Sequence, residues 1–395
     1  MRIMMLVHNR VGRGTFLRAQ SLARPLVARG HQVTIFAGAE EVSARRRETV
    51  ADGVRICQAF DPLPTRLREG GLSPFDAVSR IRLLLREEFD LLHCFDHRPA
   101  VSGPGLLAAQ VRSKPCLFDW ADRWGFGGIA DERGPMLRMT LGAMDNWLER
   151  LARRPADALT VINTSLQELA SKHFTVPVHL LPVGANSDLI RPRPKAEMRR
   201  HFGLPMEASI AVHAGVAPYD ADYLAESFVE LSKLHPGSLL LTTGRIFPAL
   251  TARAANAGIS ERVIQFGRVN QSDLEGLFAC GDVLLLPYTN RPVNRYRYPH
   301  KLGDYLSAGR PIVTNNTGDL GQLVASERVG LVAEDTPQSF AAAIKRLFDD
   351  VQLSEDLGVR GRTLAETRLD WRFLARELEE FYRETISRYQ SAARG

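Results

Sequence analysis

Apolar and polar positions at the start of the chain follow the order strand, helix, strand. Arg2–His8 is an apolar run of the kind that forms a buried strand. Gly12 and Gly14 interrupt the run, and the helical periodicity of Thr15–Arg29 then leads to a second apolar run at Gln32–Phe36. The pattern predicts a βαβ unit, whose two strands lie parallel in one sheet.

The second half of the chain repeats this pattern. Ser209–His213 predicts a strand, Gly215 a turn, Asp222–Leu234 a helix and Ser238–Thr243 the next strand. Strand and helix patterns continue to alternate after each copy. We therefore predict the fold class α/β, with two Rossmann-like doubly wound parallel-sheet domains that face a cleft, and we expect ligands beyond the carboxyl ends of the strands.

A cluster of prolines marks the predicted boundary between the domains. Three prolines fall within residues 182–194, and proline at this density ends regular structure. We expect an N-terminal domain at residues 1–185 and a C-terminal domain at residues 195–370. The last stretch predicts a long amphipathic helix that begins at Trp371.

Composition excludes several classes of protein. The 395 residues carry 51 Lys+Arg and 45 Asp+Glu, for a net charge of +6. The arginines are dispersed, without zinc-finger spacing, a basic-aromatic motif or a basic tail, so we expect no nucleic-acid partner. No apolar run reaches the ~18 residues of a spanning helix. The four cysteines are scattered without a CxxC pair, which favours reduced thiols in a cytoplasmic protein.

The strongest candidate for chemistry is the loop and helix around Lys301. Lys301 opens a predicted helix, and Asp304 lies three positions later, so both can face the same side of the first turn. A cation at a helix N-terminus suits a diphosphate, and a carboxylate one turn away can accept both hydrogen bonds of a ribose diol. A solvated Lys–Asp pair at a helix start is the alternative.

Around this site the sequence resembles GT-B glycosyltransferases, especially family four. The resemblance rests on five segments in the expected order, and it covers nearly the whole chain. These segments are MRIMMLVHNRVGRG with LVARGHQVTIFAG, then LLPVGANSDLIRP, GRVNQSDLEGLFACGDVLLLP, PHKLGDYLSAGRPIV and LDWRFLARELEEFY. The resemblance implies that the closing helix, at about 373–395, packs back on the first domain.

The resemblance implies a nucleotide-sugar donor bound by the second domain and an acceptor bound by the first. Asp304 takes the place of the glutamate that holds the ribose. Tyr296 stands where the family has a first glutamate, and the usual basic pair after the domain's opening strand is absent from HAGVAPYDAD. These departures leave the stereochemistry of transfer open. The donor-binding candidates are Gly215, Arg245, Lys301, Asp304, Asn316 and Gly318.

Two loops in the first half are candidates for acceptor binding and catalysis. His93 and Asp96 lie at or after one predicted strand, and Asp119 and Asp122 lie at the end of another, beside Trp120 and Trp124. A carboxylate there can deprotonate an acceptor hydroxyl while an indole packs on a sugar face. The alternative is that the aspartates hold turn amides, and that His93 is structural.

Gly12 and Gly14 allow a close backbone approach to an acceptor or a diphosphate. They lack the third glycine of a dinucleotide fingerprint, which disfavours a nicotinamide site. Asp220 and Asp222 match a metal-binding DxD pattern, but they stand at a helix start, where we expect Asp220 to act as a cap. We therefore assign no metal and no cofactor beyond the donor.

Residues 136–154 form an amphipathic pattern with apolar positions on one face and arginines nearby. Such a helix can face the core with a solvated rim, or it can lie on an anionic membrane surface. The excess positive charge of residues 1–190 adds an argument for an anionic acceptor or a membrane surface.

Our hypothesis is metal-independent transfer of a sugar from a nucleoside-diphosphate sugar to an acceptor hydroxyl. Lys301 and nearby arginines neutralise the leaving diphosphate. Asp119 or Asp122 acts as base if transfer is inverting, whereas no enzymatic base is needed in a retaining front-face reaction. The alternatives are a sugar-nucleotide epimerase or phosphorylase on the same fold, and a non-catalytic partner subunit.

Overall fold

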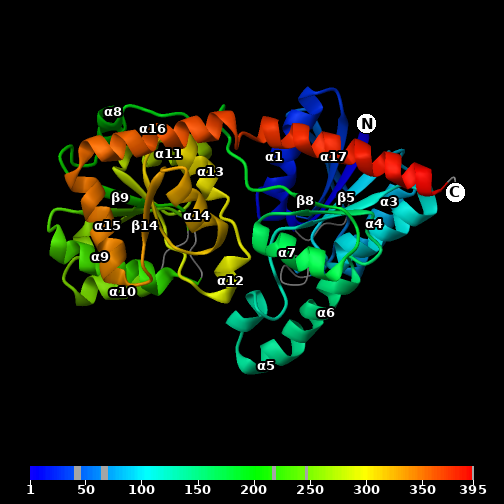
Figure 1. Cartoon of the computed structure of the whole chain (residues 1–395), viewed down its shortest axis with the longest axis horizontal. Helices are drawn as coiled ribbons and strands as arrows, with labels where there is room; N and C mark the ends of the chain where they lie inside the picture. Colours follow the sequence, from blue (N-terminus) through cyan, green and yellow to red (C-terminus); the bar gives the residue numbers. More distant parts are fainter. Residues whose placement is uncertain (40–45, 64–69, 216–218, 245–247, 394–395) are drawn as a thin grey trace. The chain divides into compact units, whose positions relative to one another are not determined.

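The computed structural model describes residues 1–39, 46–63, 70–215, 219–244 and 248–393. Its internal contacts divide the chain into two units (Figure 1). Unit 1 comprises Met1–Pro182 and Trp371–Gly395, and unit 2 comprises Val183–Asp370. The sequence places the corresponding boundaries at 185–195 and at about 373.

Unit 1 is built on an eight-stranded sheet with the order β3-β4-β2-β1-β5-β6-β7-β8. Apart from the antiparallel pair of β3 and β4, the neighbouring strands are parallel. The strands are β1 (Arg2–Arg10), β2 (Gln32–Gly38), β3 (Arg47–Ala51), β4 (Val54–Gln58), β5 (Leu91–Phe95), β6 (Cys116–Trp120), β7 (Ala158–Val161) and β8 (Val178–Leu180).

The helices of unit 1 connect these strands, as the βαβ pattern predicts. They are α1 (Thr15–Ala28), α3 (Pro74–Leu84), α4 (Pro99–Arg112), α5 (Pro135–Leu137), α6 (Ala143–Leu151) and α7 (Thr164–His173), with α17 (Trp371–Ala392) at the end of the chain. The last helix contacts α1 and buries Tyr382 completely against the unit. An Arg29–Glu379 ion pair of 2.5 Å joins the same two parts.

Unit 2 is built on a six-stranded sheet with the order β11-β10-β9-β12-β13-β14, in which every pair is parallel. Central placement of β9 and β12 buries both of their faces, which explains their nearly continuous apolar sequences. The strands are β9 (Ile210–His213), β10 (Leu239–Thr242), β11 (Val263–Gln265), β12 (Val283–Leu286), β13 (Ile312–Asn315) and β14 (Gly330–Ala333).

The helices of unit 2 bury their apolar faces against this sheet. One buried cluster brings Phe228 and Leu231 of α9 together with Phe340 and Ile344 of α15. The helices are α8 (Lys195–His201), α9 (Ala221–Leu234), α10 (Pro248–Asn256), α11 (Gln271–Cys280), α12 (Pro292–Arg295), α13 (Lys301–Ala308), α14 (Gly318–Ser326), α15 (Pro337–Asp349) and α16 (Val351–Thr367).

The described helices include none that is long and apolar enough to cross a membrane.

Candidate functional site

The carboxyl edge of the unit 2 sheet brings Lys301 next to His213. Lys301 is the first residue of α13, and His213 is the last residue of β9. The Lys301 Nζ atom lies 3.4 Å from His213 Nε2. A Cβ atom placed on Gly215, just beyond β9, would lie 3.8 Å from the same Nζ. A glycine here therefore leaves space beside the ammonium group.

The buried imidazole of His213 has a defined tautomer. Its Nδ1 lies 3.0 Å from the carbonyl oxygen of Leu285, which can only accept a hydrogen bond, so Nδ1 carries the proton. Burial, and then the charge of Lys301, hold the pKa of His213 well below its ordinary value. The ring is therefore neutral, and its Nε2 lone pair faces the lysine.

The protonation of Lys301 should depend on whether an anion is bound beside it. Burial, and to a smaller extent the charge of Arg297, lower the pKa of Lys301 to about 7, while the charge of Asp220 acts in the opposite direction. At neutral pH the ammonium form is only partly populated, because partial burial removes some of the solvation that stabilises its charge. A bound diphosphate would supply the missing negative charge and favour the protonated lysine.

Asp304 lies one helical turn from Lys301 and is half-buried. Burial raises its pKa to about 6, and a hydrogen bond with Asn186 opposes that rise. The helix is held close to the 183–187 segment, since a Cβ atom on Gly303 would lie only 2.1 Å from the Gly184 carbonyl oxygen. A carboxylate and an ammonium group thus share the first turn of α13, as the sequence predicts.

Hydrogen bonds from backbone amides hold the loops next to Lys301 in place. The Ala214 amide donates to the Tyr305 hydroxyl at 2.8 Å, and the Gly215 amide donates to Thr243 Oγ1 at 3.2 Å. Gly215 and Gly244 both have positive φ angles, and a Cβ on Gly244 would lie 3.0 Å from the Gly215 Cα. Only glycines allow this approach. Arg245, another predicted phosphate contact, lies outside the described residues.

The start of α14 forms the next part of the same sheet edge. Asn316 and Gly318 are both exposed there, and Gly318 has a φ of 52°. The neighbouring Asn315 is fully buried; its Oδ1 accepts from the Tyr288 amide at 3.0 Å, and its Nδ2 donates to the Tyr223 hydroxyl at 2.8 Å. Asn315 therefore fixes the turn that presents the two predicted donor-binding residues.

The prediction that Asp220 caps α9 is wrong. Its carboxylate accepts from the Thr289 hydroxyl at 2.6 Å and from Asn294 Nδ2 at 3.1 Å, and it makes no capping bond with the helix. The buried carboxylate instead joins the start of α9 to the loop before α12. It also favours the charged form of Lys301. Among the described residues, no three His, Cys, Asp or Glu side chains lie close enough to hold a metal ion.

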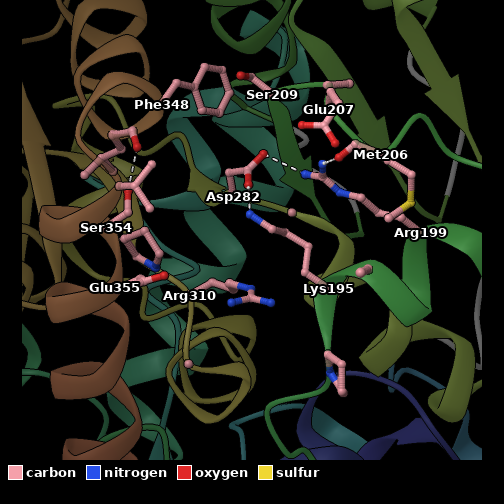
Figure 2. Close-up of a pocket in the computed structure, with 18 of the residues that line it drawn as sticks. Lys195, Arg199, Met206, Glu207, Ser209, Asp282, Arg310, Phe348, Ser354 and Glu355 are labelled. Atoms are coloured by element: carbon pink, nitrogen blue, oxygen red, sulfur yellow. Dashed lines mark hydrogen bonds and ion pairs between the residues drawn. The ribbon is translucent and has the colours of Figure 1, made fainter.

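A separate pocket of about 640 Å³ opens at the opposite, amino-terminal edge of the unit 2 sheet (Figure 2). Asp282 is the central group, since its carboxylate accepts from Lys195 at 2.7 Å, Arg199 at 2.8 Å and the Ile210 amide at 2.8 Å. These bonds tie α8 to the starts of β9 and β12. The pocket is therefore distinct from the Lys301 site, and structural ion pairs line it.

In unit 1, the structure places His93 inside β5 and not at its end. Its two ring nitrogens lie 2.7 Å from the Tyr382 hydroxyl and 3.1 Å from Thr160 Oγ1, and the side chain is fully buried. Burial lowers the pKa of His93 to about 4. These contacts connect β5, β7 and α17, which favours the structural alternative for this histidine.

Asp119 lies inside β6 and not in the loop after it. Its two oxygens accept from Arg18 Nε and Nη2, each at 3.0 Å, and one accepts from the Thr160 hydroxyl at 2.6 Å. The same guanidinium donates to the carbonyl oxygens of Leu181 and Pro182. Both charged groups are buried, which favours a structural ion pair over the acceptor base that the sequence suggests.

Replacing Asp119 by asparagine should lower the free energy of unfolding by about 3 kcal/mol, because the buried Arg18 guanidinium would lose its counter-charge. Urea denaturation followed by tryptophan fluorescence measures the loss. The double substitution Arg18→Met with Asp119→Leu removes both charges and should recover most of the stability. A single variant as stable as the parent protein would contradict the structural role.

A buried cluster lies at the carboxyl ends of β1 and β5. It contains Asp96, which the sequence names as a candidate, and His8, which sequence reasoning missed. Asp96 follows β5 with a φ of 110°, a strained value for a residue with a side chain. Its carboxylate lies 2.7 Å from His97 Nδ1 and 3.3 Å from His8 Nδ1. Burial lowers the pKa of His8 to about 4, and the facing groups hold that of Asp96 well below its usual range.

Trp124 forms one wall of this cluster. The guanidinium carbon of Arg98 lies 3.9 Å from the centre of the indole ring, and the rings of His8 and His97 approach it edge-on, with centroids 6.3 Å and 6.4 Å away. His97 Nε2 is buried and makes no hydrogen bond with the described residues. Asp122 is half-buried on the loop that carries Trp124.

A contact with Asn9 explains why position 14 is a glycine. A Cβ atom there would lie 2.3 Å from Asn9 Oδ1, and that oxygen accepts from the Thr15 amide at 2.7 Å and the Thr15 hydroxyl at 2.8 Å. Asn9 therefore holds the first turn of α1, and Gly14 makes room for it. Gly12 has a φ of 76°, and a Cβ atom on it would meet none of the described atoms within 4 Å, so it contributes an open turn.

Family models and relatives agree on the class of protein. A glycosyl transferase 4-like domain matches residues 13–185, and glycosyl transferases group 1 matches residues 209–350. The D-inositol 3-phosphate glycosyltransferase of Acidothermus cellulolyticus is 23% identical over 94% of this chain and 86% of its own length.

Solved structures agree on the fold. Sucrose-phosphate synthase from Thermosynechococcus elongatus matches with a TM-score of 0.77 at 17% identity, over 98% of this chain and 99% of that one. HepE of Anabaena, in complex with UDP and glucose, matches with a TM-score of 0.74 at 15% identity, over 97% and 100%.

The two Rossmann-like sheets and these matches define the GT-B fold, which confirms the predicted fold class. The chain belongs to the GT-B glycosyltransferases that resemble family four.

Proposed function

We propose that this glycosyltransferase takes a sugar from a nucleoside-diphosphate sugar bound by unit 2 and transfers it to an acceptor hydroxyl bound by unit 1. The observation that carries the proposal is the Lys301–His213 pair, 3.4 Å apart, beside Gly215 at the carboxyl edge of the sheet. HepE of Anabaena, a structural neighbour, is described in complex with UDP-glucose.

The diphosphate would occupy the space beside Lys301, with its charge favouring the ammonium form. His213 presents only a neutral lone pair, so it orients the lysine without competing for the anion. Asp304, one turn along α13, would accept the ribose hydroxyls. No metal is needed in this scheme, because a preorganised cation stabilises the charge that develops on the leaving diphosphate.

The acceptor hydroxyl would meet the Asp96–His97 pair in unit 1. The Asp96 carboxylate, 2.7 Å from Nδ1, would hold the imidazole by charge attraction, and Nε2 would be left to accept a proton. Trp124 offers an apolar face against which a sugar ring can pack. In this proposal His97 takes the base role that the sequence assigned to Asp119 or Asp122. The oxygens of Asp119 already accept from Arg18 and Thr160.

A thermal-shift panel of nucleoside diphosphates and their sugars tests the proposal, followed by product analysis with the donor that stabilises the protein most. We expect one nucleoside diphosphate to bind and its sugar conjugate to be consumed only with an acceptor. Turnover without an acceptor would favour an epimerase, and failure to bind any nucleotide would indicate a non-catalytic subunit. The anomeric configuration of the product separates inverting from retaining transfer.

Affinity for the nucleoside diphosphate should be highest between pH 6 and pH 7. Below about pH 6 Asp304 becomes protonated and loses acceptor capacity. Above about pH 7 Lys301 is mostly neutral before the ligand binds, so binding must take up a proton and weakens with rising pH. Calorimetry in buffers of different ionisation enthalpy measures that uptake. Lys301→Arg, which stays charged, should remove the alkaline decline; a decline that persists in this variant would contradict the assignment.

A further inference from the structure

The helical segment from Pro135 to Leu151 has its acidic residues inside and several large apolar residues outside. The buried positions include Asp145 and Glu149, with exposed fractions of 1% and 3%, followed by Arg153 at 0%. A surface helix of a globular protein normally shows the opposite arrangement. The core-facing alternative that the sequence offers for this segment is therefore wrong.

Each inward charge has a specific partner. Asp145 accepts from Arg98 at 2.7 Å and from Arg133 at 2.6 Å. Arg98 is the residue that stacks on Trp124, so the helix supports the proposed acceptor site from behind. Charge pairing inside the unit accounts for why the helix turns this face inward.

Glu149 holds the tryptophan loop through three hydrogen bonds. Its carboxylate accepts from Trp120 Nε1 at 2.9 Å, from the Trp124 amide at 2.8 Å and from the Gly125 amide at 3.1 Å. Arg153 lies over the Trp120 ring, 4.5 Å from its centre. Arg153 is fully buried, so it is not one of the arginines of residues 136–154 that could face a membrane.

The outward face is correspondingly apolar. Met136 is 75% exposed, Met139 is 76% exposed and Trp147 is 61% exposed. A π-helical turn at Arg138–Gly142 lies between α5 and α6. We call this surface the outer face of the α5–α6 segment, and it comprises Met136, Leu137, Met139, Leu141, Trp147 and Leu151.

The exposed charges of this segment are all positive. Arg138, Arg150 and Arg154 are exposed, whereas the two carboxylates within residues 134–154 are the buried Asp145 and Glu149. Arg138 contacts Asp131, 2.8 Å away, just before the segment. Apolar side chains with an exposed tryptophan and a cationic rim complement an anionic lipid surface, where acyl chains and headgroups meet.

We propose that the outer face of the α5–α6 segment inserts into the headgroup region of an anionic membrane. Its methionines, leucines and Trp147 leave water, while Arg150 and Arg154 meet lipid phosphates. Because Asp145 and Glu149 of the same segment hold Arg98 and the Trp124 loop, binding would present the proposed acceptor pocket at the lipid surface. The membrane contact itself does not depend on the proposed sugar transfer.

Flotation of the full chain with vesicles tests this inference. We expect binding to vesicles of equal parts phosphatidylglycerol and phosphatidylcholine, and at least tenfold weaker binding to pure phosphatidylcholine. Met139→Ser with Trp147→Ser should reduce the partition coefficient at least tenfold. The control pair Val351→Ser with Val359→Ser, on an exposed part of α16, should leave it unchanged. Thermal unfolding confirms that each variant folds.

Trp147 fluorescence gives a direct readout. Trp120 and Trp371 are buried and Trp124 is half-buried, so a blue shift on adding anionic vesicles should vanish in Trp147→Phe while binding persists. Equal binding of the double variant and the parent protein would overturn the inference. So would a dimer that depends on Met139 and Trp147 without any vesicle binding, since a second copy would then be the occupant.

Discussion

Replacing Lys301 by alanine should lower kcat roughly 10²–10³-fold, the range measured for losing one preorganised donor to a developing negative charge. The lysine lies 3.4 Å from a neutral histidine and beside a glycine, so its ammonium is directed at the proposed diphosphate site. Release of the nucleoside diphosphate from the donor measures the loss. Because the interaction grows as the diphosphate leaves, kcat should fall more than the KM for donor rises.

Lys345→Ala provides the matched control for this prediction. Lys345 also belongs to unit 2, but it lies on the surface of α15 in an ion pair with Asp349. An exposed pair of this kind contributes little to stability. Near-normal turnover of Lys301→Ala, or an equal loss in Lys345→Ala, would remove Lys301 from the mechanism.

The parallel-sheet fold could be predicted because each strand carries its own signal. Ile210–His213 and Val283–Leu286 are short apolar runs between polar turns, and both are central strands. The hairpin of β3 and β4 escaped prediction, because β3 (Arg47–Ala51) is exposed and carries no apolar pattern. A strand is predicted from the apolar pattern that its burial requires. An exposed edge strand has no such pattern, so the sequence gives little indication of it.

The donor part of the candidate site could be predicted because Lys301 and Asp304 are neighbours on one helix. Spacing alone puts them on the same turn. The partner of Lys301 is His213, 88 positions away, and only the parallel order of β9 and β12 brings it there. The predicted βαβ unit places His213 at the end of a strand, but it does not predict how far His213 lies from the helix that begins at Lys301.

The roles of the polar residues in unit 1 were harder to predict, because their partners are distant in the sequence and only the tertiary structure brings them together. Asp119 and Arg18 are 101 positions apart, and their pairing withdraws the aspartate from solvent. The predicted orientation of the α5–α6 segment was wrong for a related reason. Asp145 and Glu149 form ion pairs and hydrogen bonds inside the unit, so the face that carries them turns inward and the apolar face turns outward. Hydrophobic periodicity predicts which residues share a face, but buried charge pairs decide which face turns inward.

His97→Ala should reduce transfer roughly a thousandfold, if proton acceptance by a positioned side chain contributes in its usual range. Asp96 contacts His97 Nδ1 at 2.7 Å, and Nε2 makes no hydrogen bond among the described residues. Nε2 is therefore the nitrogen that would accept the proton of a bound hydroxyl in the proposed reaction. Asp96→Asn should give a smaller loss, because the ring remains but its orientation and its charged form lose support.

Two measurements separate this role from a structural one. His97→Ala should leave the affinity for the nucleoside diphosphate unchanged, because the donor groups belong to unit 2, whereas Lys301→Ala should weaken it. His173→Ala, at the exposed end of α7 in the same unit as His97, should keep full activity. If His97→Ala turns over normally, the leaving diphosphate must take the acceptor proton itself. The product should then retain the anomeric configuration of the donor, and a retained configuration in the parent enzyme would point to the same front-face reaction.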